Sequence, residues 1–289
     1  MVAPLKHDAF SSYLFNHLAI GILIILVCVS NVYSQDYIAA NLSKPSELVN
    51  QSDPSEQIEF NSLTGDWWGT RTLLYKSGYE FSFSVKNDYI SSFTKNERGN
   101  DYLNLFDFNA LLDINELFGW NDATFFAQVL GINGSAPERH CGAIQGISNI
   151  ASPQQWRLYQ IWIEKNFADN SLSILAGLFD LNSEFDVRST TGLFLNPSWG
   201  IGADFAFSGV NGPSIYPSTS MALRVSYKFD KNYSLRVGAF DAVPGNYNEA
   251  YLSHIFNLTK DGLLLVAEAN YSEGEEEIRD GFGKYSIGG

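Results

Sequence analysis

The feature that most constrains this chain is a pair of segments in which apolar and polar residues alternate with a period of two. The segments are Arg157–Asn166 and Ser171–Asp180, joined by the short stretch Phe167–Asn170, which ends in turn-forming residues. In the first segment, Tyr159, Ile161 and Ile163 share one face, and Gln160, Trp162 and Glu164 share the other. A period of two places alternate side chains on opposite faces of a β-strand, so we predict a β-hairpin with an apolar and a polar face.

The same alternation recurs in six further segments, and a ninth begins close to the last residue. They are Glu80–Asp88, Asp101–Asp113, Ala123–Ile132, Thr219–Phe229, Tyr233–Asp241 and Leu263–Ser272, and the ninth opens at Gly283–Tyr285. Short turns join most neighbours, and short turns connect antiparallel strands. We therefore predict an all-β fold with about eight or nine antiparallel strands in this chain.

Aromatic residues favour one all-β architecture over another. They gather towards the ends of the alternating segments, where a transmembrane β-barrel would place them at the two membrane interfaces. A soluble β-sandwich also alternates but has no need of this placement. The pattern favours an antiparallel transmembrane β-barrel and leaves the sandwich as the alternative. In a barrel, the charged residues of the polar faces would point inward, and these are Lys86, Asp107, Arg157, Glu164, Arg224, Arg236 and Glu268.

Charge and composition exclude several classes of protein. The chain has 32 Asp and Glu against 18 Lys and Arg, a formal charge of −14, which disfavours a nucleic-acid partner because like charges repel. After residue 40 no apolar run is long enough for a membrane-spanning helix. The four histidines lack metal-ligand spacing and no phosphate-binding glycine loop is present, so we expect no metal and no cofactor.

The chain divides into three parts. Residues 1–34 resemble a signal peptide, because Leu18–Ser30 is an apolar core of suitable length, although an uncleaved anchor stays an alternative. Residues 35–62 are polar, contain Pro45 and Pro54 and lack a sustained period, which predicts an irregular extension. Residues 63–289 hold the predicted strands. Only Cys141 lies beyond the signal peptide, so we expect no intramolecular disulfide.

A long segment without a strand pattern follows the hairpin. It carries Asp180, Glu184, Asp186 and Arg188 and then Gly192–Asp204, which contains Gly, Asn and Trp residues, Trp199 among them. Loops of this length are usually functional. The carboxylates of Asp180 and Glu184 could serve a retaining glycosidase, but acidic pairs are common where a strand meets a loop, and we do not predict an enzyme.

Several motifs, in a fixed order, resemble the OprB-type carbohydrate-selective porins. They are Leu63–Trp67 with Gly69 and Arg71, Leu112–Asp113 with Leu117, Gly119 and Trp120, Leu158–Tyr159 with Trp162 and Glu164, Gly177–Asp180 with Ser183–Phe185, and Phe194–Asn196. The resemblance covers roughly residues 63 to 289. One departure is Trp68, where the family usually has a second glycine.

The resemblance implies a bacterial outer-membrane channel for passive, selective diffusion of small sugars. It implies a barrel of about sixteen strands, contact with outer-membrane lipid, a loop folded into the lumen, and a homotrimer as one assembly state. The residues expected to line the pore or bind sugar are Arg157, Trp162, Glu164, Asp180, Glu184, Arg188, Asn196 and Trp199. Of these, Trp162 or Trp199 could stack on a pyranose ring. A soluble or surface-attached β-sandwich that binds carbohydrate without transport is the alternative.

The number of strands bears on the extent of the barrel domain. Eight strands give an interior that side chains fill, whereas about sixteen leave an aqueous channel. Eight strands and the opening of a ninth are too few for a channel. From this we expect the barrel domain to be incomplete at its C-terminal end.

Overall fold

The protein is described here by a computed structural model that covers residues 63–93, 98–134, 136–141, 146–188, 194–245, 261–273 and 283–289. Nine β-strands dominate these residues. They are β1 (Tyr79–Phe93), β2 (Arg98–Asp113), β3 (Ala123–Asn133), β4 (Gln155–Phe167), β5 (Leu172–Phe179), β6 (Ser220–Lys228), β7 (Tyr233–Asp241), β8 (Leu263–Glu273) and β9 (Gly283–Gly288). All nine predicted strands are therefore confirmed. The predicted signal peptide and polar extension lie outside the described residues.

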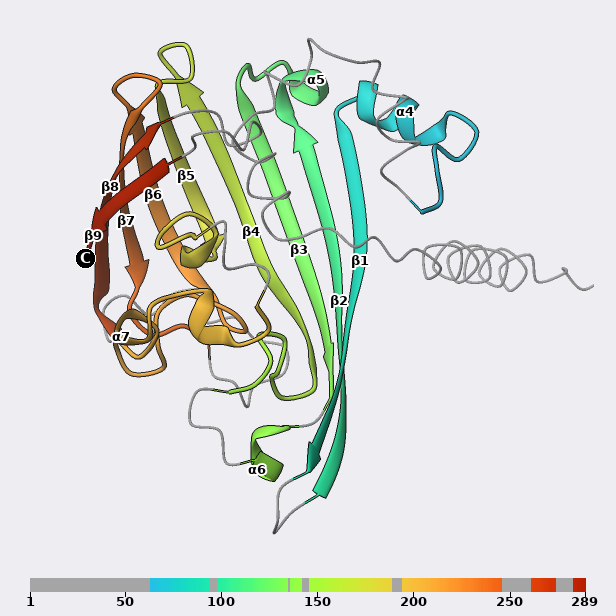
Figure 1. Cartoon of the computed structure of the whole chain (residues 1–289). Coiled ribbons are helices and arrows are strands. Elements are labelled where there is room, and N and C mark those ends of the chain that lie inside the picture. The colour runs from blue at the N-terminus through green and yellow to red at the C-terminus, as the bar shows by residue number, and fades with distance from the viewer. Residues whose placement is uncertain are drawn as a thin grey trace, which may run out of the picture.

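The strands form a single curved sheet in which sequence neighbours pair antiparallel from β1 to β9 (Figure 1). Among the described residues β1 and β9 are its edges, so the sheet is open there. A sandwich needs two packed sheets, and the part of the chain that the structure describes has one, so the sandwich alternative is not favoured. Within that same part, no helix has the length and apolar character to cross a membrane.

The two faces of the sheet differ in polarity as the alternation predicts. Large apolar side chains on the outer face are exposed, and they include Phe81, Leu158, Ile161, Leu223, Val225, Val237 and Leu265. The opposite, inner face buries polar side chains, among them Asp107, Asn109, Gln128, Gln160, Arg224 and Glu268. An apolar outside with a polar inside is the arrangement of a membrane β-barrel and the inverse of a soluble protein.

A β-bulge in β4 corrects the predicted faces. The register with β3 pairs Gln128 with Gln160 and then Val129 with Leu158, so Tyr159 is an extra residue. A bulge of this kind turns two consecutive residues to one side. Tyr159 and Gln160 are accordingly both buried on the inner face, while Leu158 and Ile161 are outside. The prediction that Tyr159 shares the apolar face with Ile161 is wrong for this reason.

The shared motifs near the N-terminal end of the sheet are built from local contacts. Before α4 (Thr70–Lys76), Asp66 accepts hydrogen bonds from the backbone N–H and hydroxyl of Thr72 at 2.7 and 2.9 Å. Trp67 and Trp68 have φ of 51° and 57°, a left-handed conformation that glycine adopts most readily. This explains why a glycine suits the position of Trp68, whose side chain is fully exposed.

A second motif forms the connection between β2 and β3. Asp113 caps α5 (Ile114–Phe118) by accepting from the backbone N–H groups of Asn115 and Glu116, and Gly119 ends the helix at φ 70°. A carboxylate at the start and a left-handed glycine at the end satisfy the free backbone groups of a short helix. These motif residues therefore shape a turn of the sheet.

Candidate functional site

The long connection between β5 and β6 folds back against the inner face of the sheet. It contains the short helices η2 (Leu181–Ser183), η4 (Pro197–Trp199) and α7 (Ala203–Ala206), which lie in front of the strands in Figure 1. Leu181 and Phe185 are fully buried in an apolar cluster. Its buried strand residues are Phe126, Trp162, Leu175, Phe179, Ala222, Phe240 and Val266. We call residues 180–188 and 194–219 the inner loop, and this cluster holds its first turn against the sheet.

Asp180 begins the inner loop as a helix cap. Its carboxylate accepts a hydrogen bond from the Tyr159 hydroxyl at 2.7 Å and from the backbone N–H of Asn182 at 2.9 Å. Burial raises the pKa of Asp180 to about 6, against the lowering effect of these two hydrogen bonds. The backbone N–H of Asp180 donates to Gln160. The bulge in β4 thus supplies two inward side chains that hold the start of the loop.

A line of amides continues from this cap across the inner face. Gln160 donates to Gln128 at 2.8 Å, and Gln128 donates to Asp107 at 2.8 Å. The line joins β4, β3 and β2 by side chains that are all buried. Buried polar groups persist in folded proteins when they are paired in this way. These hydrogen bonds therefore order the polar inner face of the sheet well beyond the inner loop.

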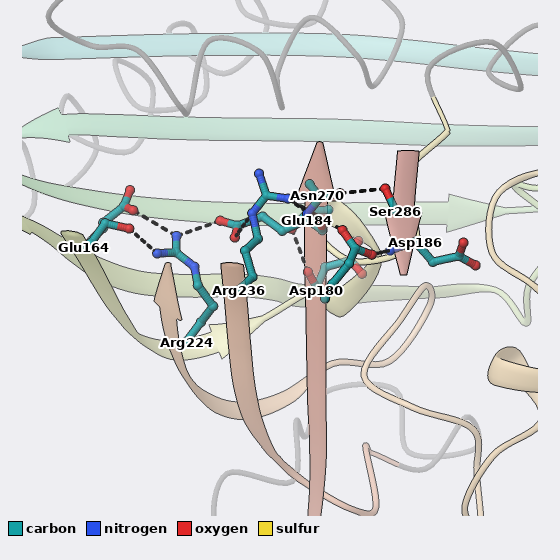
Figure 2. A network of polar contacts seen from close by, with 11 residues as sticks. Glu164, Asp180, Glu184, Asp186, Arg224, Arg236, Asn270 and Ser286 are labelled. Carbon is teal, nitrogen blue, oxygen red and sulfur yellow. Dashed lines mark hydrogen bonds and ion pairs between the residues drawn. The ribbon is translucent and has the colours of Figure 1, made fainter. Parts of the chain in front are cut away.

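Two arginines and three glutamates form a second polar network, which Figure 2 shows together with its neighbours. Arg224 of β6 contacts Glu164 of β4 at 2.8 Å and Glu184 of the inner loop at 2.6 Å. Arg236 of β7 lies 3.5 Å from Glu184 and 3.7 Å from Glu268 of β8. We call these five residues the charge ladder. It ties the inner loop to three strands beyond the hairpin from which the loop starts.

Arg188 is the one Lys or Arg of the inner loop, and its side chain is exposed. Its side chain is 46% exposed, and its guanidinium lies 3.0 Å from the Asp186 carboxylate. Asp186 also accepts from the backbone N–H of Gly202 at 2.6 Å, and its own N–H donates to Glu268 at 2.7 Å. Asp186 therefore connects Arg188 to both the loop and the ladder.

The other two predicted loop residues lie at the far end of the loop. Asn196 caps η4 by accepting from the backbone N–H of Ser198, and its amide donates to the carbonyl of Gly146 at 3.0 Å. Trp199 is 47% exposed and stacks on Phe194 with ring centroids 4.6 Å apart. An exposed indole face of this kind can contact a sugar ring.

A second connection reaches the same region. The segment between β3 and β4 contains α6 (Glu138–Cys141), and its later part packs under the inner loop. The backbone N–H of Asn149 donates to the carbonyl of Leu195 at 2.7 Å, and the Tyr216 hydroxyl donates to the carbonyl of Ile150 at 2.8 Å. The two connections therefore form one body on the inner face.

Two of the predicted site residues are buried, so a solute inside the barrel cannot reach them. Trp162 is 3% exposed within the apolar cluster, so it cannot stack on a sugar and that expectation is corrected. Arg157 is also 3% exposed, because its guanidinium donates to Gln155, Ser218 and the carbonyl of Pro217. It anchors the end of the inner loop. Both residues are on the inner face, as predicted, but underneath the loop.

Sequence reasoning placed Arg224, Arg236 and Glu268 on the polar face without linking them to the loop. The signal available was their position on adjacent strands of one face, where Arg236 lies opposite Glu268 and Arg224 is two positions from Ser226, the residue opposite Arg236. The contact with Glu184 depends on the path of the loop, which no alternation encodes. The structure brings Glu164 and Glu184 together through Arg224 and leaves Arg188 and Trp199 as the exposed members of the predicted set, with Asn196 partly buried.

A curved antiparallel sheet, apolar outside and polar inside, with a loop packed against its inner face, is the architecture of a porin. The model of the carbohydrate-selective porin OprB family matches residues 97–289. The chain therefore belongs to the OprB family, a family of channels rather than enzymes. The described residues contribute nine strands to this fold, with the two edges open.

Individual relatives agree with this assignment. Porin B of Pseudomonas aeruginosa is 25% identical over 249 residues, which are 78% of this chain and 51% of that protein. Two solved structures of Pseudomonas putida OprB, one at high pH and one at low pH, are each 24% identical. They superpose with TM-scores of 0.63 and 0.51, covering 82% and 78% of this chain and 57% and 59% of theirs. The chain spans about half the length of the curated relatives it matches.

Proposed function

We propose that this protein forms part of an outer-membrane channel for the passive, selective diffusion of small sugars. The observation that carries the proposal is the inner loop, which lies on the polar face of a porin sheet and presents exposed polar and aromatic groups there. Passive flux needs binding that is strong enough to admit a solute and weak enough to release it. A polyhydroxylated solute can exchange its hydration water for such groups.

Three residues of the inner loop are proposed to contact the permeating sugar. Arg188 and Asn196 offer hydrogen-bond donors and acceptors, and Trp199 offers an aromatic face. Glu184 adds a carboxylate whose side chain is 23% exposed, less open than Arg188. Together they combine opposite charges with an aromatic platform, which suits neutral, polar solutes. The membrane lipid is the proposed partner of the exposed apolar outer face.

Swelling of liposomes that contain the complete barrel to which these nine strands belong tests this function. Vesicles in solutions of a monosaccharide should swell faster than vesicles in a disaccharide, because the inner loop narrows the passage. Arg188→Ala should change the relative rates of neutral and acidic sugars, since it removes the one cation of the inner loop. Liposomes that stay impermeable to every sugar, although the protein is folded in their membrane, would contradict the proposed function.

A further inference from the structure

We infer that Arg224 is a positioning residue of the channel. It does not contact the solute, but it fixes the positions of Glu184 and Arg188 in the inner loop. The inference rests on the proposed function, because it assigns the residue that sets the geometry of the proposed sugar contacts. Arg224 is 2% exposed, so no permeating molecule can reach it. Its effect must pass through the groups that it holds.

Arg224 is bound from three directions. One terminal nitrogen lies within hydrogen-bond distance of both Glu164 and Glu184, at 2.8 and 2.6 Å. The other terminal nitrogen donates to the Ser173 hydroxyl. These partners belong to β4, the inner loop and β5, so one side chain of β6 joins four elements. A planar guanidinium offers several donors in a fixed arrangement, which an ammonium group cannot reproduce.

The segment Glu184–Asp186 is held at nearly every polar group. Arg236 contacts the Glu184 carboxylate and donates to the Glu184 carbonyl at 3.3 Å. The Asn182 amide donates to the carbonyls of Phe185 and Asp186 at 3.1 and 3.4 Å. Since the Phe185 side chain is also fully buried, this segment has one position on the wall. Asp186 then holds Arg188.

Removing the guanidinium would disturb this position in a defined direction. Glu164 and Glu184 both approach one nitrogen of Arg224, so without it two carboxylates would face each other on the inner wall. Like charges at short range repel, and a buried acid without its partner is destabilised. The strand residue Glu164 cannot move, whereas Glu184 belongs to a loop. We expect the loop to shift away from β4 and to carry Arg188 with it.

Two variants test the inference without leaving an extra buried charge. Arg224→Lys keeps the positive charge but loses the multiple donors, and the double variant Arg224→Met with Glu164→Gln removes one cation and one acid. Arg98→Met, at the exposed start of β2, is the matched control for loss of an arginine. Each variant is made in the complete barrel to which these nine strands belong, and its folding is first checked by the difference in gel migration between unheated and boiled samples.

Trypsin reports the position of the loop independently of transport. Arg188 is the one Lys or Arg between Lys165 and Arg224 in the sequence, so cleavage after it is assignable by mass. Both Arg224 variants should be cleaved there about tenfold faster, because loss of a charge-assisted contact favours local opening. The Arg98 variant should be cleaved at the wild-type rate.

Liposome swelling then decides whether the position matters for function. Both Arg224 variants should lower the ratio of monosaccharide to disaccharide uptake by about threefold or more, while Arg98→Met keeps the wild-type ratio. Faster cleavage with an unchanged ratio would make Arg224 a purely structural residue and overturn the inference. Unchanged cleavage would overturn it directly. A wild-type protein that passes no sugar would refute the proposed function, and the inference with it, even if cleavage shows that Arg224 holds the loop.

Discussion

The buried cap Asp180 makes the attachment of the inner loop depend on pH. Its pKa is raised from 3.8 to about 6 by burial, so between these values the folded loop binds a proton that the detached loop releases. Stability from this group is therefore greatest at low pH and falls as pH rises through that range, levelling off above about 6. A shift of this size corresponds to about 3 kcal/mol.

Asp180→Asn removes the titration while keeping an oxygen acceptor for the N–H of Asn182. Hydrogen exchange of the peptide that spans η2 should be measured for wild type and variant at about pH 3.5 and about pH 7.5. Other carboxylates titrate in both proteins, so the wild-type to variant ratio of protection isolates Asp180. We expect this ratio to fall by about a hundredfold on going to the higher pH.

The outcome that would refute this reasoning is equally specific. A protection ratio that is constant with pH would mean that Asp180 titrates alike in both states. A ratio that rises with pH would mean that the hydrogen bonds from Tyr159 and Asn182 outweigh the burial of the carboxylate. Either result would show that the loop is not weakened by ionisation at its cap.

Three further predictions concern the wall of the sheet. Ile161→Arg, on the outer face, should lower the unfolding free energy in bilayers by about 2–4 kcal/mol near the midplane, whereas Ser226→Arg, on the inner face, should cost far less; equal losses in denaturant titrations would refute the faces. Gly177→Ala should destabilise the hairpin by at least about 1 kcal/mol, because φ is 144° and a methyl group would collide with the backbone of β4; an unchanged melting temperature would count against this packing. Trp162→Phe should leave the ratio of sugar uptake rates unchanged in liposome swelling, since its indole N–H has no hydrogen-bond partner among the described residues and its ring is buried under the inner loop.

The sequence was sufficient for the strands and for most of their faces. In a strictly alternating segment such as Thr219–Phe229, the apolar residues all lie on one side of the strand. Once the outer face is known to be apolar, every side chain of the segment is assigned to a face. The prediction of the two faces is wrong in β4, because a bulge adds one residue there and the alternation does not show the position of the bulge. Arg157 and Glu164 are an odd number of positions apart, so they share the inner face only if the strand changes phase between them. That spacing was the available clue.

The site was less accessible to prediction than the fold. The place of Glu184 and Arg188 after the hairpin predicts that they belong to the loop, but the partners that hold Glu184 and Asp186 come from β6, β7 and β8. Contacts between a loop and distant strands depend on the three-dimensional course of the loop, which the periodicity of the sequence does not predict. Trp162 was misjudged because its polar-face position indicated exposure, whereas Leu181 and Phe185 of the loop cover it.

The charge ladder has a consequence for engineering channels of this kind. The inner loop is specified by residues that are spread over four strands, so it is not a module that can be exchanged by itself. A loop transplanted into another barrel without counterparts of Arg224, Arg236 and Glu268 would carry Glu184 and Asp186 to a wall that cannot receive them. Redesign of such a channel should therefore transfer the inner loop together with the strands whose side chains hold it.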